Sequence, residues 1–126
     1  MTISKLDHVN VKTTQLDEMI SWYSSVLGMT SGKRPDFSFP GAWMYAGDHA
    51  MVHLVGISGE AGTGSEVPLK LEHFAFSANG CAEFEDRLKL QGVKYRKSEL
   101  TEYQLIQINV WDPDGNHIHL DFPANE

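Results

Sequence analysis

The chain of 126 residues lacks the features that mark several classes of protein. It contains one cysteine, Cys81, so no disulfide can form within the chain. No apolar run is long enough to cross a bilayer, and the first residues do not resemble a signal peptide, so we expect a cytoplasmic protein with no membrane partner. Lysine and arginine total 10 against 17 acidic residues, a formal net charge of −7. This balance, with the basic residues scattered, argues against a nucleic-acid partner.

What the sequence does contain is a repeat that carries histidines. Leu6-Asp7-His8-Val9 recurs as Leu71-Glu72-His73-Phe74, and Val52-His53-Leu54 recurs as Ile118-His119-Leu120. The two spacings, 65 and 66 residues, are almost equal. Two copies of one half-domain would therefore each carry one histidine on a first strand and another on a last strand.

The order of elements is the same in both halves. The patterns predict strands over 6–12, 29–33, 42–46 and 50–56 in the first half, and over 69–77, 94–97, 103–111 and 116–122 in the second. A helix follows the first strand of each half and ends at Gly28 or Gly92. Thr14 and Asp17 resemble a capping box at the start of the first helix. The fold class is thus predicted as α+β, with helices outside a curved sheet.

The boundaries follow from composition. We expect a single domain over 1–126, made of a first βαβββ module over about 4–57 and a second over about 69–123. The segment 58–68 between them is rich in glycine and polar residues, which is typical of a linker.

The four repeated histidines are predicted to share one face of each half. Side chains alternate along a strand, and most residues flanking these histidines are apolar, as expected where the opposite face packs on a helix. If the halves pack face to face around a pseudo-two-fold axis, the four imidazoles converge, and imidazole is the commonest metal ligand in proteins. His49 and His117 lie off the repeat and are expected at the surface or beside the ligands.

These residues match a known family. The two copies, the ending Asp112-Pro-Asp-Gly-Asn-His-Ile-His-Leu and the helix end Trp22-Tyr-Ser-Ser-Val-Leu-Gly28 resemble the vicinal oxygen chelate superfamily. That superfamily includes glyoxalase I, extradiol dioxygenases, fosfomycin-resistance thiol transferases and bleomycin-resistance proteins. The resemblance covers about 6–122 and implies paired βαβββ modules in a cupped, barrel-like mixed sheet around a divalent metal. It implies four metal ligands: His8, His53, His73 and His119.

The ligand set departs from the family pattern at its last position. His119 stands where the usual ending has a glutamate, so none of the four predicted ligands is anionic. Neutral imidazoles leave the metal formally +2, which makes it a stronger Lewis acid and favours a divalent transition metal such as Zn, Ni, Fe, Co or Mn. Four imidazoles could instead close a structural zinc site, or three could bind and leave one position open.

The catalytic and substrate-binding residues are less defined by the pattern. Asp121, two residues after His119 on the same strand face, is the candidate base. An imidazole released from the metal is the alternative base. Asp121 could also be an ordinary exposed acid at the end of a strand, without a catalytic role. Related proteins often wall the substrate cavity with the region around residues 34–45, so Arg34, Phe39 and Trp43 are candidate substrate contacts. Packing between aromatic rings would explain the same residues.

Three functions remain open at this point. The first is a metal-dependent enzyme, a lyase, isomerase or dioxygenase, that acts on a small oxygen-chelating substrate. The alternative is a non-catalytic protein of the bleomycin-resistance type that binds an antibiotic or metabolite, and a third is a structural metal in an interaction module. We expect a homodimer, in which the modules pair within one chain or are exchanged between two.

Overall fold

The computed structural model describes residues 1–58 and 71–126. The chain divides into two compact units, residues 1–68 and 69–126, which we call module 1 and module 2 and describe one at a time. The predicted linker over 58–68 lies outside the described residues except for Ser58. Within the described part of the chain, no helix is both long and apolar enough to span a membrane.

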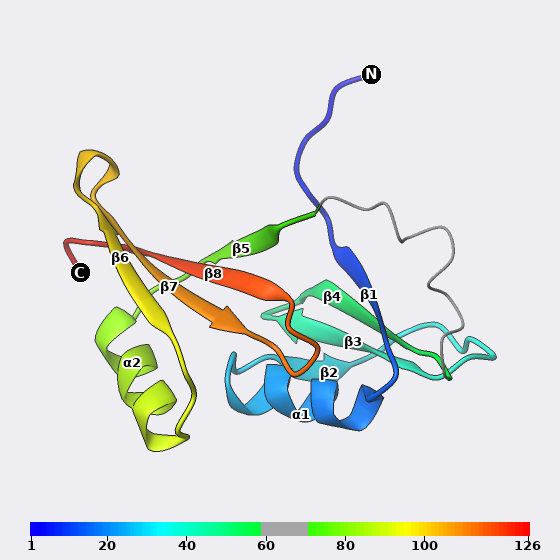
Figure 1. Cartoon of the computed structure of the whole chain (residues 1–126). Coiled ribbons are helices and arrows are strands. Elements are labelled where there is room, and N and C mark those ends of the chain that lie inside the picture. Colours follow the sequence, from blue (N-terminus) through cyan, green and yellow to red (C-terminus); the bar gives the residue numbers. More distant parts are fainter. Residues whose placement is uncertain (59–70) are drawn as a thin grey trace. The chain divides into compact units, whose positions relative to one another are not determined.

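Module 1 is a four-stranded sheet with one helix. Its elements are β1 (Val9–Thr13), α1 (Leu16–Ser25), β2 (Thr30–Gly32), β3 (Gly41–Ala46) and β4 (His49–Gly56). The strand order is β1-β4-β3-β2, with β1 parallel to β4 and the other neighbours antiparallel. Helix α1 packs on β2, β3 and β4, as seen in Figure 1. The core is formed by the fully buried Met19, Tyr23, Met44, Val52 and Leu54.

Module 2 repeats this arrangement. It contains β5 (His73–Ser77), α2 (Cys81–Leu90), β6 (Arg96–Leu100), the short 3-10 helix η1 (Thr101–Tyr103), β7 (Leu105–Trp111) and β8 (His117–Pro123). The order is β5-β8-β7-β6, with β5 parallel to β8 and the other neighbours antiparallel. Phe84 of α2 contacts Phe122 of β8, with ring centroids 5.8 Å apart. The predicted α+β class and the two βαβββ modules are confirmed.

The alternation of burial predicted for the histidine strands is present in β8 but not in β4, where Val52, His53 and Leu54 are all buried. In β8, Ile118, Leu120 and Phe122 are buried while the residues between them are half-buried. In module 1 the residues that flank His53, Val52 and Leu54, are buried. The histidines therefore project from the sheet face opposite to the one that these core residues occupy.

Some local predictions were wrong in detail, among them the strand predicted over 94–97, which is β6 (Arg96–Leu100). Strand β1 begins at Val9 rather than Leu6, and the side chain of Leu6 is exposed. Helix α1 begins at Leu16 with Gln15 as its N-cap, and no side chain caps it. The Thr13 hydroxyl instead accepts a hydrogen bond from the Gln15 backbone N–H at 3.0 Å. Thr14 lies outside the helix, too early for a capping box.

Candidate metal centre

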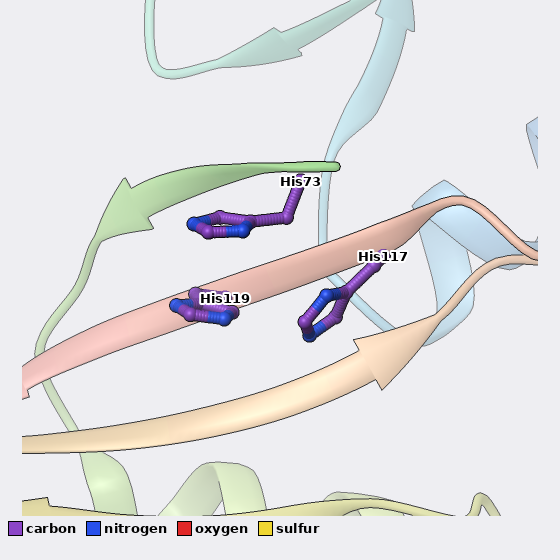
Figure 2. A group of neighbouring side chains, drawn as sticks. All are labelled: His73, His117 and His119. Carbon is purple, nitrogen blue, oxygen red and sulfur yellow. The ribbon is translucent and has the colours of Figure 1, made fainter. Parts of the chain in front are cut away.

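Three histidines of module 2 form a cluster on one face of its sheet. His73 begins β5, and His117 and His119 lie on the neighbouring β8, two residues apart and therefore on the same side (Figure 2). One possible ligand atom from each lies within 4.8 Å of the other two. Parallel pairing of β5 and β8 places His73 directly opposite His117, which is why the first and last strands of the module bring the rings together.

The rings of the cluster have a defined geometry. His73 and His119 are stacked, with centroids 4.1 Å apart and planes inclined by 10°. His117 is tilted against both, by 59° to His73 and 65° to His119. On its other side the His117 ring stacks on Trp111 at 5.0 Å. The cluster is thus held in place by ring contacts as well as by the sheet.

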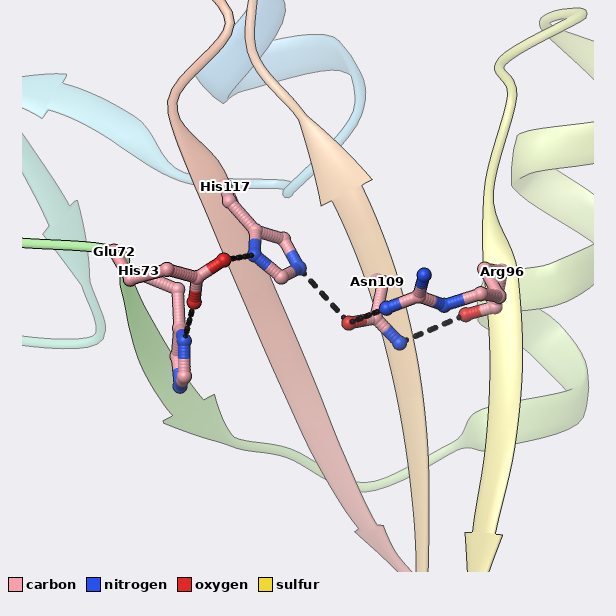
Figure 3. Close-up of polar contacts among 5 residues, drawn as sticks. All are labelled: Glu72, His73, Arg96, Asn109 and His117. Carbon is pink, nitrogen blue, oxygen red and sulfur yellow. Dashed lines mark hydrogen bonds and ion pairs between the residues drawn. The ribbon is translucent and has the colours of Figure 1, made fainter.

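One carboxylate joins two of these rings. Glu72 accepts hydrogen bonds from Nδ1 of His73 and, at 2.9 Å, from Nδ1 of His117 (Figure 3). These hydrogen bonds, above all that of His73, lower the pKa of Glu72 below its ordinary value. A carboxylate can only accept from an imidazole N–H, so both rings carry a proton on Nδ1 and turn Nε2 away from Glu72.

On the side away from Glu72, His117 contacts the side-chain amide of Asn109. The Asn109 side-chain NH₂ donates to the Arg96 carbonyl oxygen at 3.1 Å, which orients Oδ1 toward His117. This Oδ1 lies 2.9 Å from Nε2 of His117 (Figure 3). The ring of His117 is therefore held between Glu72 and Asn109, and only about 11% of its side chain is exposed.

His119 is suited to act as a neutral ligand. Burial, and then the nearby His73 and His117, lower its pKa below the ordinary histidine value. A metal binds the unprotonated imidazole, so a lowered pKa keeps the lone pair available at neutral pH.

Module 1 holds its own pair of repeated histidines. His8 and His53 are stacked, with centroids 3.8 Å apart and planes inclined by 12°. Trp43 stacks on the other face of His53 at 4.0 Å. His53 is only 8% exposed, and burial lowers its pKa. Its Nε2–H donates to the Ala50 carbonyl oxygen at 3.2 Å, which leaves Nδ1 with the free lone pair.

The carboxylate of module 1 occupies the place that Glu72 has in module 2. Asp7 accepts a hydrogen bond from Nδ1 of His8 at 2.7 Å, and this bond lowers the pKa of Asp7. His49, which lies off the repeat, donates from Nε2 to the Asp7 backbone carbonyl oxygen at 2.7 Å. Each module therefore has an acid that directly precedes its first histidine and orients it.

The remaining predicted site residues fall into separate groups. The Arg34 guanidinium lies over the rings of Phe37 and Phe39, at 5.0 and 5.4 Å, and donates to the Phe39 carbonyl oxygen at 3.2 Å. Trp43 instead belongs to the histidine stack of module 1. Asp121 is half-buried on β8, and its Oδ1 has no hydrogen-bond partner among the described residues.

His117 is the member of the cluster that the sequence predicted at the surface or beside the ligands rather than among them. It breaks the 65–66-residue spacing, because the residue of module 1 at the same place in the repeat is Met51. Its position two residues before His119 does predict that both rings lie on the same face of one strand. Its contact with His73 depends on strand pairing, which that spacing does not show.

Comparison with known proteins agrees with this fold. Residues 5–120 match the family model of the Glyoxalase/Bleomycin resistance protein/Dioxygenase superfamily, and the chain belongs to that superfamily. Its relative "Glyoxylase I 4" from Arabidopsis thaliana is 28% identical over 127 residues, which cover 94% of this chain and 70% of the relative.

Solved structures show the same fold along the whole chain. A glyoxalase family protein from Bacillus anthracis superposes with a TM-score of 0.77 at 24% identity, covering 98% of each chain. Lactoylglutathione lyase from Agrobacterium tumefaciens superposes with a TM-score of 0.69 at 15% identity, covering 99% of this chain and 98% of that one.

The residues present fit a transition metal. In a tetrahedral site with metal–nitrogen bonds of about 2.0–2.1 Å, ligand nitrogens lie about 3.3 Å apart. The atoms of the module 2 cluster lie within 4.8 Å of one another, so the side chains would have to move closer together to hold one ion. Imidazole nitrogens suit zinc, nickel, iron or copper rather than magnesium or calcium.

Proposed function

We propose that this protein is a metal-dependent enzyme that acts on a small substrate with two adjacent oxygen atoms. The observation that carries the proposal is the histidine cluster of module 2, in a chain that belongs to a superfamily containing glyoxalases and dioxygenases. A bound transition metal would supply Lewis acidity toward the substrate oxygens. His8, His53, His73 and His119 are the proposed ligands.

The chain's own residues have distinct proposed roles. Glu72 and Asp7 each hold Nδ1 of a histidine and so fix which nitrogen faces a metal. Asp121 is the proposed base, because its Oδ1 has no hydrogen-bond partner among the described residues and can accept a proton from substrate. Arg34, Phe39 and Trp43 are proposed to contact the substrate.

The first experiment measures metal content and an open coordination position. Protein purified without chelator should carry about one transition metal per chain, and His119→Ala should lower this content, whereas His49→Gln should not. Metal-loaded protein should bind acetohydroxamate, a small ligand with two adjacent oxygens, and EDTA-treated protein should not. A chain that takes up none of Zn, Ni, Co, Mn or Fe(II) would exclude the proposal.

The second experiment separates an enzyme from a binding protein. Asp121→Asn should retain metal and acetohydroxamate binding but lose turnover of 2-hydroxyketone or catechol substrates. Ligand binding that survives EDTA treatment, without turnover by the wild type, would identify a non-catalytic binding protein instead. A metal that resists exchange and excludes acetohydroxamate would identify a structural site.

We also propose that the protein is a homodimer in the cytoplasm. A homodimer in the cytoplasm agrees with the single cysteine and with the family, and sedimentation tests it. Only monomer at micromolar concentration would exclude the dimer.

A further inference from the structure

We infer that His117 is a metal ligand and that module 2 holds the ion through its own three histidines, His73, His117 and His119. This inference rests on the proposed function in that a metal is bound, and it replaces His8 and His53 of the proposed ligand set with His117. It changes the ligand set, because the repeat predicts one pair of histidines from each module.

The first support is that the three histidines lie on one pair of hydrogen-bonded strands, β5 and β8. His73 and His117 are register partners on adjacent strands, and His119 lies on the same strand face as His117. Their ligand atoms all lie within 4.8 Å (Figure 2). The three side chains need no residue from outside module 2 to come together.

The second support is the shared carboxylate. Metal-binding histidines almost always donate their other ring N–H to a carboxylate or carbonyl group, which fixes the tautomer. Glu72 provides this contact to His73 and His117 at once (Figure 3). The His73 ring is thereby set to offer Nε2, the His117 ring is held by Nδ1, and one negative charge lies beside the pair that would hold a cation.

The third support is the contrast with module 1. The residue of module 1 that corresponds to His117 is Met51, so module 1 has a pair of histidines where module 2 has three. The residue that corresponds to Asn109 is Trp43, which stacks on His53 instead of offering an oxygen to a third ring. The two copies therefore differ at the two positions that complete the cluster.

Metal binding by His117 requires that its contact with Asn109 is broken. Nε2 of His117 lies 2.9 Å from Asn109 Oδ1, and because an amide oxygen only accepts, Nε2–H donates to it. To bind a metal, His117 has to release this proton to solvent and turn Nε2 away from the amide. The ring also stacks on Trp111, which makes Trp111 a reporter for any ion bound at His117.

The test uses the full chain and Co(II) as the probe. Trp111 is kept as the only tryptophan by Trp22→Phe and Trp43→Phe, and its fluorescence and the cobalt absorption bands are followed during titration. We expect one Co(II) per chain and strong quenching of Trp111. His117→Met, which introduces the residue that module 1 has at this place, should weaken binding at least about tenfold. The double variant His8→Ala/His53→Ala should still bind one Co(II) and quench Trp111.

The outcomes separate the two proposals. If wild-type chain binds no Co(II), both fail. If His117→Met binds Co(II) as the wild type does, or if the double variant binds none, the three-histidine site is excluded while the proposed function survives. Should His117→Met fail to fold, NMR of ¹⁵N-histidine wild-type protein replaces it: Co(II) must shift the Nδ1–H signal of His117, and an unshifted signal excludes the site.

Discussion

The imidazole rings of His73 and His119 lie parallel, with 4.1 Å between their centroids. A metal ion accepts the nitrogen lone pair in the plane of each ring, so one ion cannot lie in the planes of two rings stacked in this way. Binding of one ion by both residues therefore requires that one ring turns and the stack opens.

Opening of the stack is testable by NMR. Zinc added to metal-free protein should shift the ring carbon-bound protons of His73 and His119, because each ring loses the ring current of the other. His49, which is hydrogen-bonded to the Asp7 backbone in module 1, serves as the control and should shift little. Unchanged His73 and His119 signals in zinc-saturated protein would contradict the prediction.

Burial of the His53 ring by Trp43 should lower the pKa of His53. The pKa of His53 is lowered mainly by burial, and Trp43 covers one face of its ring. Trp43→Ala should therefore raise the pKa of His53 in metal-free protein toward the ordinary value, since water can then stabilise the imidazolium. An NMR pH titration measures it. Trp43→Phe keeps an aromatic cover and should give a smaller rise; an equal rise in both would rule out this cause.

The Glu126 side chain should stabilise helix α2. Its carboxylate accepts from the backbone N–H of Gly80 at 2.9 Å and of Cys81 at 2.8 Å, at the start of the helix. Free N–H groups at a helix start attract negative charge, so Glu126→Ala should lower the free energy of unfolding by about 1 kcal/mol. Urea unfolding measures the loss. Asn125→Ala, the matched change at the exposed neighbour, should have little effect, and equal effects would refute the cap.

The ion pair between Glu85 of α2 and Lys97 of β6 should contribute to the free energy of unfolding in a pH-dependent way. Lys97 Nζ lies 2.8 Å from Glu85 Oε1, and this hydrogen bond is the main cause that lowers the pKa of Glu85. As the pH falls, Glu85 of the unfolded chain takes up a proton near its ordinary pKa, before Glu85 of the folded chain does. The stabilisation is therefore fully present above about pH 4.5 and is lost as the pH falls through the lowered pKa of the folded state.

The measurement compares unfolding at two pH values. Glu85→Gln should cost about 0.5–1 kcal/mol at pH 7, because the pair is partly exposed, and less at pH 3. Glu83→Gln, at an exposed acid of the same helix, is the control. A loss from Glu85→Gln that is as large at pH 3 as at pH 7 would argue against the ion pair.

Much of the fold could be predicted because the sequence repeats. The repeat placed a strand and a helix at the start of each half. Gly92 directly follows the C-cap of α2 and Gly28 lies three residues after the end of α1, with positive φ of 66° and 71°. Cys81 is buried, and burial raises the pKa of its thiol, in agreement with a residue that packs rather than reacts. These features depend on local pattern, which the sequence displays directly.

The contacts of the site depend on register instead. That His117 faces His73 follows from the parallel pairing of β5 and β8, and no local pattern specifies that pairing. The role of Glu72 depends on the same register, since its carboxylate reaches a residue 45 positions away. The repeat identifies equivalent positions of the two halves, and the halves differ at His117.

Strands β1 and β5 lie at the edges of their sheets, whereas β4 and β8 lie inside. Edge strands open locally more easily than central ones, so their amide protons exchange sooner with solvent. In each module one repeated histidine lies on or just before the edge strand and the other on the adjacent central strand. An ion shared by His73 and His119 would join the edge strand to the central strand, and slower amide exchange along β5 would report that link.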